Sequence, residues 1–159
     1  MPEEMHEDRE EFWDRLEDIR TGMLGVNGRY VPMSHNLEPE DGNIWFLTAQ
    51  GTDMAKAAAE GADTRYIVCG DAKSIYADIE GHLEVSTSKE KLDEVWNAMA
   101  STWFEEGKED KDIVLIRLVP RQAEVWLGPE SGLQFLWTMA KAKVTGEEPD
   151  FGKNFRLIF

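Results

Sequence analysis

The sequence predicts an α+β domain that is mainly β, built either as a layered fold or as a small barrel with helices at its rim. Three observations predict it. Asn27-Gly28 separates the apolar runs 22–26 and 29–33, and such a pair is the strongest local signal of a β-hairpin. Residues 75–85 alternate between apolar and polar side chains, which is the period of a half-buried strand. Helical patterns lie between the strands without a regular βαβ alternation, which disfavours a parallel sheet.

The first predicted helix covers residues 3–20, because Phe12, Leu16 and Ile19 recur at the spacing of one helical face. The other residues of this segment are nearly all charged. We therefore expect a surface helix that contacts the core through a narrow stripe.

The middle of the chain predicts two strands around a short helix. Apolar and aromatic residues fill both faces of 43–48, which is typical of a strand covered on both sides. Asp53 is placed to cap a helix over 53–60. A strand at 66–69 precedes the alternating strand, in which Gly81 indicates a bulge or bend.

The clearest helix is predicted at 89–104, where five apolar residues recur with helical spacing and Thr87–Glu90 fits a capping box. Strands are predicted at 112–119 and 122–127. They are interrupted at Pro120, because proline cannot donate to the sheet. The C-terminal segment, 131–159, predicts a helix over 133–143 and a terminal strand over 155–159.

The length of 159 residues fits a single domain, 1–159, that buries its core without disulfides. Cys69 is the single cysteine; we expect it to be buried, and it favours a reducing compartment. No signal peptide and no membrane-spanning run are apparent. We expect a cytoplasmic protein without a membrane partner.

The net charge of −15, from 32 acidic and 17 basic residues, argues against nucleic acid as a partner, because nucleic-acid binding depends on neutralising phosphates with Lys and Arg. His6, His35 and His82 lack the spacing of metal ligands. Ser34 and His35 are neighbours in a predicted strand and point to opposite faces, so they cannot form a nucleophile–base pair. No catalytic residue and no metal site are predicted.

Several short patterns occur in a characteristic order. They are Val31-Pro32-Met33, Trp45-Phe46-Leu47-Thr48, Lys56, Tyr76, Gly81, Trp103-Phe104 and Ala123-Glu124-Val125-Trp126. In this order and spacing they resemble the general stress protein branch of the pyridoxamine 5′-phosphate oxidase-like family. The resemblance implies an FMN-binding split β-barrel with flanking helices. It also implies a homodimer with one FMN in each of two grooves between the subunits.

The resemblance also implies the cofactor-binding residues, which are Pro32, Met33, Leu47, Thr48, Lys56, Tyr76 and Trp126. Leu47 and Thr48 match the strand that meets the flavin and its phosphate, and Lys56 matches a phosphate-binding position. Tyr76 matches a polar contact to the ring. Trp126 matches an aromatic residue that lies against the ring across the dimer interface. The implied function is an FMN-binding stress-related flavoprotein with weak oxidoreductase activity.

The chain departs from the family pattern at Val31 and Ala55, where relatives often have arginines. Each lost guanidinium removes a bidentate phosphate contact; Arg29 or Arg65 could compensate. An alternative is therefore a dimeric binding or structural stress protein that has lost tight flavin binding. FAD, a deazaflavin or haem in the same groove is a further alternative, because split barrels hold several cofactors.

The Arg and His that pyridoxamine phosphate oxidases carry shortly after the tryptophan are missing. Gly132, Gln134 and Leu136 occupy this stretch after Trp126. We therefore expect that the chain is not a pyridoxine 5′-phosphate oxidase.

Overall fold

The computed structural model describes residues 3–37, 41–70, 74–96, 107–129, 132–147 and 152–159. The strands are β1 (Thr21–Val26), β2 (Arg29–Ser34), β3 (Asn36–Leu37), β4 (Ile44–Ala49), β5 (Asp63–Gly70), β6 (Ile75–Ser86), β7 (Ile113–Leu127) and β8 (Lys153–Ile158). The helices are α1 (Glu3–Glu17), α2 (Asp53–Ala59), α3 (Lys89–Val95), α4 (Gly132–Thr145) and the short 3-10 helix η3 (Gly107–Glu109). No helix in these ranges is long and apolar enough to cross a membrane.

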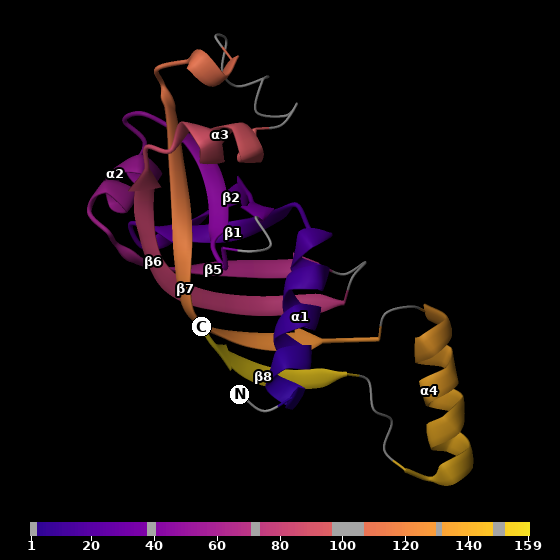
Figure 1. The fold of residues 1–159 in the computed structure, drawn as a ribbon. Helices are drawn as coiled ribbons and strands as arrows, with labels where there is room; N and C mark the ends of the chain where they lie inside the picture. The colour runs from indigo at the N-terminus through magenta and orange to yellow at the C-terminus, as the bar shows by residue number, and fades with distance from the viewer. Residues whose placement is uncertain (1–2, 38–40, 71–73, 97–106, 130–131, 148–151) are drawn as a thin grey trace.

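The strands form one antiparallel sheet in the order β2-β1-β5-β6-β7-β4-β3, with β8 beside β7. β2 contacts β4 although the two lie near opposite ends of this order, and only His35 separates β2 from β3. The sheet therefore curls back on itself as a half-barrel (Figure 1). The mainly β, split-barrel fold class is confirmed.

The predicted hairpin is confirmed. β1 and β2 pair from Thr21 opposite Ser34 to Val26 opposite Arg29. Asn27 and Gly28 join them with φ angles of 50° and 75°, which are the positive values that a type I′ turn requires.

The two long strands β6 and β7 pair with each other in the middle of the sheet. Their register shifts by one residue, because Glu80 lies opposite Gln122 whereas Gly81 lies opposite Pro120. Arg121 is the extra residue of this bulge. A Cβ on Gly81 would collide with the Val119 carbonyl, so glycine is needed where the backbones approach. The predicted irregularity at Gly81 is confirmed.

Three predictions about β7 and the helix starts are wrong. Pro120 does not interrupt the strand, since the bulge beside it lets one strand run from Ile113 to Leu127. Thr52, not Asp53, caps α2, because its hydroxyl accepts the Ala55 amide at 3.1 Å. Ser88 caps α3 in place of Thr87, by accepting the Lys91 amide at 3.1 Å.

Two further predictions need correction. The helix expected over 89–104 ends at Val95, because Trp96 has extended backbone angles; the rest of that range lies outside the described residues. Cys69 is exposed. Tyr66 and Val68 point into the core, and strand alternation therefore turns Cys69 to the opposite face.

The main core lies between the inner face of the sheet and the helices α1 and α2. Phe12 and Leu16 of α1 are fully buried, as predicted, in one cluster with Tyr66 and Ile79 of the sheet. Ile19, expected on the same helical face, lies beyond the end of α1 at Glu17 and is only partly buried against this core. Figure 1 shows α1 lying across this sheet. The buried stripe of α1 is narrow, and the other side of the helix is charged.

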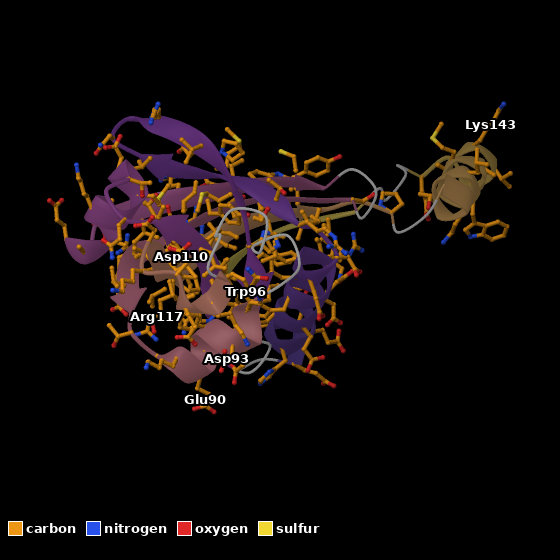
Figure 2. The ribbon with its side chains drawn as sticks, turned by 90° about the horizontal axis from the view of Figure 1, so that it is seen from above. Glu90, Asp93, Trp96, Asp110, Arg117 and Lys143 are labelled. Atoms are coloured by element: carbon orange, nitrogen blue, oxygen red, sulfur yellow. The ribbon has the colours of Figure 1, made fainter. Side chains whose placement is uncertain are left out.

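α4 differs from the other helices because it stands apart from the body (Figure 1), and Figure 2 shows its Lys143 well away from the sheet. The helix and the strand that follows it, β8, were both expected from the sequence. Leu136, Trp137 and Val144 of α4 are exposed, so a largely apolar helix projects from the protein.

Candidate functional site

Two aromatic side chains lie next to each other on the outer face of the sheet. Tyr76 on β6 is directly opposite Trp126 on β7, and the two side chains are 38% and 45% exposed. Cys69 on β5 and Asn154 on β8 continue the same row on either side. We call this row, Cys69, Tyr76, Trp126 and Asn154, the open face. Direct cross-strand pairs stand close enough to form one surface, so the predicted site residues Tyr76 and Trp126 are together.

The rows beside the open face carry paired charges. The Arg65 guanidinium lies 2.6 Å from the Asp78 carboxylate, and Gln122 donates a hydrogen bond to Glu80. That hydrogen bond, assisted by the nearby guanidinium of Arg65, lowers the pKa of Glu80. This carboxylate therefore stays ionised at neutral pH and is a poor proton donor.

A second charged group lies further along the same strands. Arg117 donates to the Glu84 carboxylate at 2.8 Å, and the His82 ring lies 3.0 Å from it. The hydrogen bonds from His82 and then Arg117 lower the pKa of Glu84. Neither carboxylate has the raised pKa expected of a general acid.

The predicted phosphate residues lie around the start of α2. Thr48 at the end of β4 places its hydroxyl 3.0 Å from the hydroxyl of Thr52, the cap of α2. Lys56 is exposed on α2, whereas Ala55 beside it is buried in the core. An arginine at position 55 would therefore have to leave the core, so this helix cannot carry the family cation there without repacking.

Leu47 and Thr48 point to opposite faces of β4, as alternation requires. Leu47 is half-buried beneath α3, where it packs with Trp45 and Leu115 of the sheet and with Leu92 of the helix. The end of the outer face that carries Leu47 is thus covered, unlike the open face.

Pro32 and Met33 lie on β2, beside the seam where the barrel closes. Pro32 is exposed and Met33 is half-buried against the core. The Tyr66 hydroxyl oxygen lies 3.1 Å from the Met33 carbonyl, so the backbone at this position contacts the core. Val31, which replaces the family arginine, also packs against the core.

Within one chain five of the seven predicted site residues lie in two separate places, Tyr76 with Trp126 at one and Leu47, Thr48 and Lys56 at the other, while Pro32 and Met33 lie on β2. Tyr76 lies near the start of β6, whereas Ser86 at its end lies opposite Leu115, which in turn lies opposite Leu47. At about 3.3 Å per residue, the ten positions from Tyr76 to Ser86 span roughly 33 Å along the strand. One copy of the chain therefore does not bring Tyr76 and Trp126 to Leu47, Thr48 and Lys56.

The structure places one cation near the start of α2 that the sequence could not place. The Arg29 guanidinium, next to the hairpin turn, lies 3.7 Å from the Asp53 carboxylate of α2. Arg65 instead lies on the outer sheet surface. Arg29, Arg65 and Arg121 share the lining of a groove of about 410 Å³ beside the hairpin. No local sequence pattern encodes this proximity, because the residues lie on separate elements of the fold.

His35 belongs to the core. It is buried, its Nδ1 lies 2.6 Å from the Tyr66 hydroxyl, and its Nε2 lies 3.0 Å from the Leu16 carbonyl. Burial lowers the pKa of His35 and raises the pKa of Tyr66. Among the described residues, no group of three or more His, Cys, Asp or Glu is placed to hold a metal ion.

The family model described as pyridoxamine 5′-phosphate oxidase like matches residues 7–150. The chain belongs to this family. No curated protein matches the sequence.

Solved structures agree with this assignment. A crystal structure from Jannaschia sp. CCS1, assigned as general stress protein 26, is 43% identical; the match covers 97% of this chain and 99% of the other, with a TM-score of 0.90. The general stress FMN/FAD binding protein from Xanthomonas citri is 30% identical over 79% of this chain and 92% of its own, with a TM-score of 0.71. A Clostridium acetobutylicum protein related to general stress protein 26, 14% identical over 98% of this chain and 94% of its own, shares the fold with a TM-score of 0.64.

Proposed function

We propose that this chain binds a flavin, FMN in the first place and FAD in the second, in a groove completed by a second copy of the chain. The observation that carries the proposal is the exposed pair Tyr76 and Trp126, which lies at one end of the β6–β7 ladder while Leu47 and Thr48 lie at the other. A two-fold dimer that sets the aromatic end of one copy against the β4 end of the other would unite both groups. The flavin named for the Xanthomonas citri relative supports the ligand.

The residues present fit the flavin ring better than its phosphate. Trp126 and Tyr76 offer an exposed flat apolar surface for the ring. For the phosphate, Thr48 supplies a hydroxyl and Lys56 an ammonium, and the Arg29 guanidinium lies beside Asp53 of α2. The Asp53 carboxylate beside Arg29 offsets part of the positive charge of that guanidinium. We therefore expect the phosphate to be held more weakly than in relatives that keep both arginines.

A bound flavin supplies the redox chemistry, because it accepts two electrons from a donor. The chain would bind and orient the flavin and exclude water from its ring. The ionised carboxylates Glu80 and Glu84 are held by hydrogen bonds, so they offer no proton to a substrate. We therefore propose a weak oxidoreductase without a dedicated acid or base. The argument against a pyridoxine 5′-phosphate oxidase comes from the residues after Trp126, where Gly132, Gln134 and Leu136 replace the oxidase pattern.

The second candidate is a dimeric stress protein that binds or scaffolds without a tightly held flavin. The specific observation in its favour is the core packing at positions 31 and 55, where Val31 and Ala55 leave no arginine for a phosphate.

An absorption spectrum of the purified protein, followed by titration with FMN and with FAD, separates the two candidates. We expect a flavin band or saturable flavin binding, and slow anaerobic bleaching of the bound flavin by a nicotinamide donor. With pyridoxamine 5′-phosphate we expect no hydrogen peroxide release, since the substrate-anchoring residues are missing. Failure to bind any flavin would favour the scaffold candidate, and vigorous peroxide release would contradict our interpretation of residues 132–136.

A further inference from the structure

One arginine of α1 connects two strand ends that lie next to the open face. The Arg15 side chain is 11% exposed, and its Nη1 donates to the Gly128 carbonyl at 2.9 Å and to the Ser74 carbonyl at 3.2 Å. Ser74 directly precedes β6, and Gly128 directly follows β7. A single guanidinium therefore holds the start of one strand against the end of the other.

Tyr76 and Trp126 lie at this end of the β6–β7 ladder. Only one residue pair separates them from the end of the register, and beyond that pair the Gly128 amide donates to the Ser74 carbonyl at 2.7 Å. The ends of strands open more readily than their middles. Whatever closes this end therefore also fixes the aromatic pair.

The backbone at this end has an uncommon conformation. Ser74 has a φ of 49°, a left-handed value that residues other than glycine rarely adopt. A Cβ on Gly128 would lie 3.0 Å from the Ser74 Cβ, so the two segments approach closely. The Ser74 carbonyl that accepts from the Gly128 amide also accepts from Arg15, and a charged donor makes the stronger hydrogen bond. Arg15 thus stabilises this close approach.

The same side chain reaches the neighbouring strand β8 through Glu11. Arg15 Nη2 donates to one oxygen of the Glu11 carboxylate at 2.7 Å, and the Lys153 ammonium lies 3.3 Å from the other oxygen. Lys153 begins β8 and precedes Asn154, the open-face residue beside Trp126. A planar guanidinium serves two carbonyls and a carboxylate at once in a fixed geometry, which an ammonium does not. α1 therefore ties together the ends of β6, β7 and β8.

We propose that Arg15 is the positioning residue of the flavin site. From α1, which covers the inner face of the sheet (Figure 1), it holds the strand ends so that the rings of Tyr76 and Trp126 on the outer face keep the spacing that the flavin ring requires. This inference rests on the proposed function, in which that pair contacts the ring. Arg15 acts through the strands and does not touch the flavin. A surface that is fixed before binding loses little freedom when the ligand arrives, so loss of Arg15 should weaken flavin binding.

The flavin-free protein tests the positioning itself. With 5-fluorotryptophan at the six tryptophans, the variant Trp126→Phe assigns the Trp126 resonance in a fluorine NMR spectrum. Arg15→Gln should broaden or shift that resonance and leave the resonance of Trp45, on β4, as in the wild type. The matched control is Arg9→Gln, which removes another guanidinium of α1, one that donates to the Ile158 carbonyl of β8. It should leave the Trp126 resonance unchanged, since Ile158 lies at the other end of β8 from the open face.

Flavin binding gives the second readout. Arg15→Gln should raise the dissociation constant for FMN at least about tenfold, and Arg9→Gln by less than about twofold, with urea denaturation showing that both variants remain folded. Arg15→Lys keeps the charge but not the planar fork, so its FMN affinity should lie between those of the wild type and Arg15→Gln. Arg15→Lys also provides both readouts if Arg15→Gln does not fold.

A Trp126 resonance that both Arg15 variants leave unchanged, or equal FMN affinities for Arg15→Gln and Arg9→Gln, would overturn the inference. Its failure is distinguishable from that of the proposed function, because the NMR measurement needs no flavin. If the wild type binds no flavin while Arg15→Gln alters the Trp126 resonance, only the proposed function is refuted, and Arg15 still orders the open face. If the wild type binds flavin and the Arg15 variants bind it equally well, only the positioning role is refuted.

Discussion

Tyrosine has opposite surroundings in two regions of the molecule. One region is the seam where the barrel closes, between β2 and β4, and the other is the open face of the sheet. At the seam, Tyr66 is fully buried, and its hydroxyl lies 2.6 Å from His35 Nδ1 and 3.1 Å from the Met33 carbonyl. On the open face, Tyr76 and Trp126 present exposed rings. The surroundings of Tyr66 are complete within one chain, so it serves the fold. Exposed paired aromatics instead indicate contact with another molecule.

The strongest test of this contrast removes one hydroxyl from each region. Tyr66→Phe leaves the buried His35 Nδ1 without its hydrogen bond, and an unsatisfied buried polar atom costs about 1–3 kcal/mol. Tyr76→Phe changes an exposed side chain and should alter the free energy of unfolding by less than about 0.5 kcal/mol. Urea denaturation of both variants measures the difference. Equal losses would mean that the two regions do not differ in the way proposed.

The open face is tested by its effect on ligand binding. Trp126→Ala should weaken FMN binding at least tenfold, which is about 1.4 kcal/mol, because it removes the flat surface proposed for the ring. Its free energy of unfolding should change little, since the side chain is exposed. The control is Tyr30→Ala, a similarly exposed aromatic residue in the hairpin, which should bind FMN as wild type does. Equal affinity of all three proteins would exclude Trp126 from the flavin site.

A smaller effect is expected at the proposed phosphate group. Lys56→Ala should weaken FMN binding about tenfold through loss of a charge-assisted contact, and the loss should shrink as salt is added. Lys89→Ala removes another exposed lysine, at the start of α3, and controls for net charge. If the two variants bind FMN equally, the phosphate does not lie at α2.

The sequence predicted the elements whose signals are local. The Asn27-Gly28 turn, the alternation of β6 and the buried stripe of α1 depend on residues near in sequence, and all are confirmed. The caps of α2 and α3 were each misplaced by one residue, because a serine or threonine next to the expected cap competes equally well.

Long-range register could not be predicted in the same way. The continuity of β7 through Pro120 depends on a bulge opposite Gly81 of β6. For the candidate site, the sequence suggested the residues through resemblance, but not that they form two groups at opposite ends of one ladder. That separation follows from the pairing of β6 with β7 and of β7 with β4. Only the sheet register reveals this separation, on which the proposal of a second copy rests.

The smallest expected effect is the pH dependence of stability that arises from His35 at the seam. Burial lowers the pKa of His35, so the ring is neutral in the folded protein, with its Nε2–H donating to the Leu16 carbonyl at 3.0 Å. In the unfolded chain a histidine has a pKa of about 6.5. Between the lowered folded value and this unfolded value, the unfolded chain binds more protons, so stability increases with pH. The contribution is complete above about pH 6.5 and declines as the pH falls below it.

Urea denaturation of the wild type and of His35→Gln between pH 5.5 and 7.5 measures this contribution. The pKa values of Glu80 and Glu84 are lowered from their ordinary value near 4.5. Both carboxylates therefore stay ionised between pH 5.5 and 7.5, and they add little to the pH dependence of the free energy of unfolding in this range. We expect the wild type to lose stability toward pH 5.5 and His35→Gln to show a flatter dependence, even though the variant is less stable overall. If the free energy of unfolding depends on pH in the same way for both proteins, His35 does not titrate in this range. The contrast between the seam and the open face would then depend on packing alone.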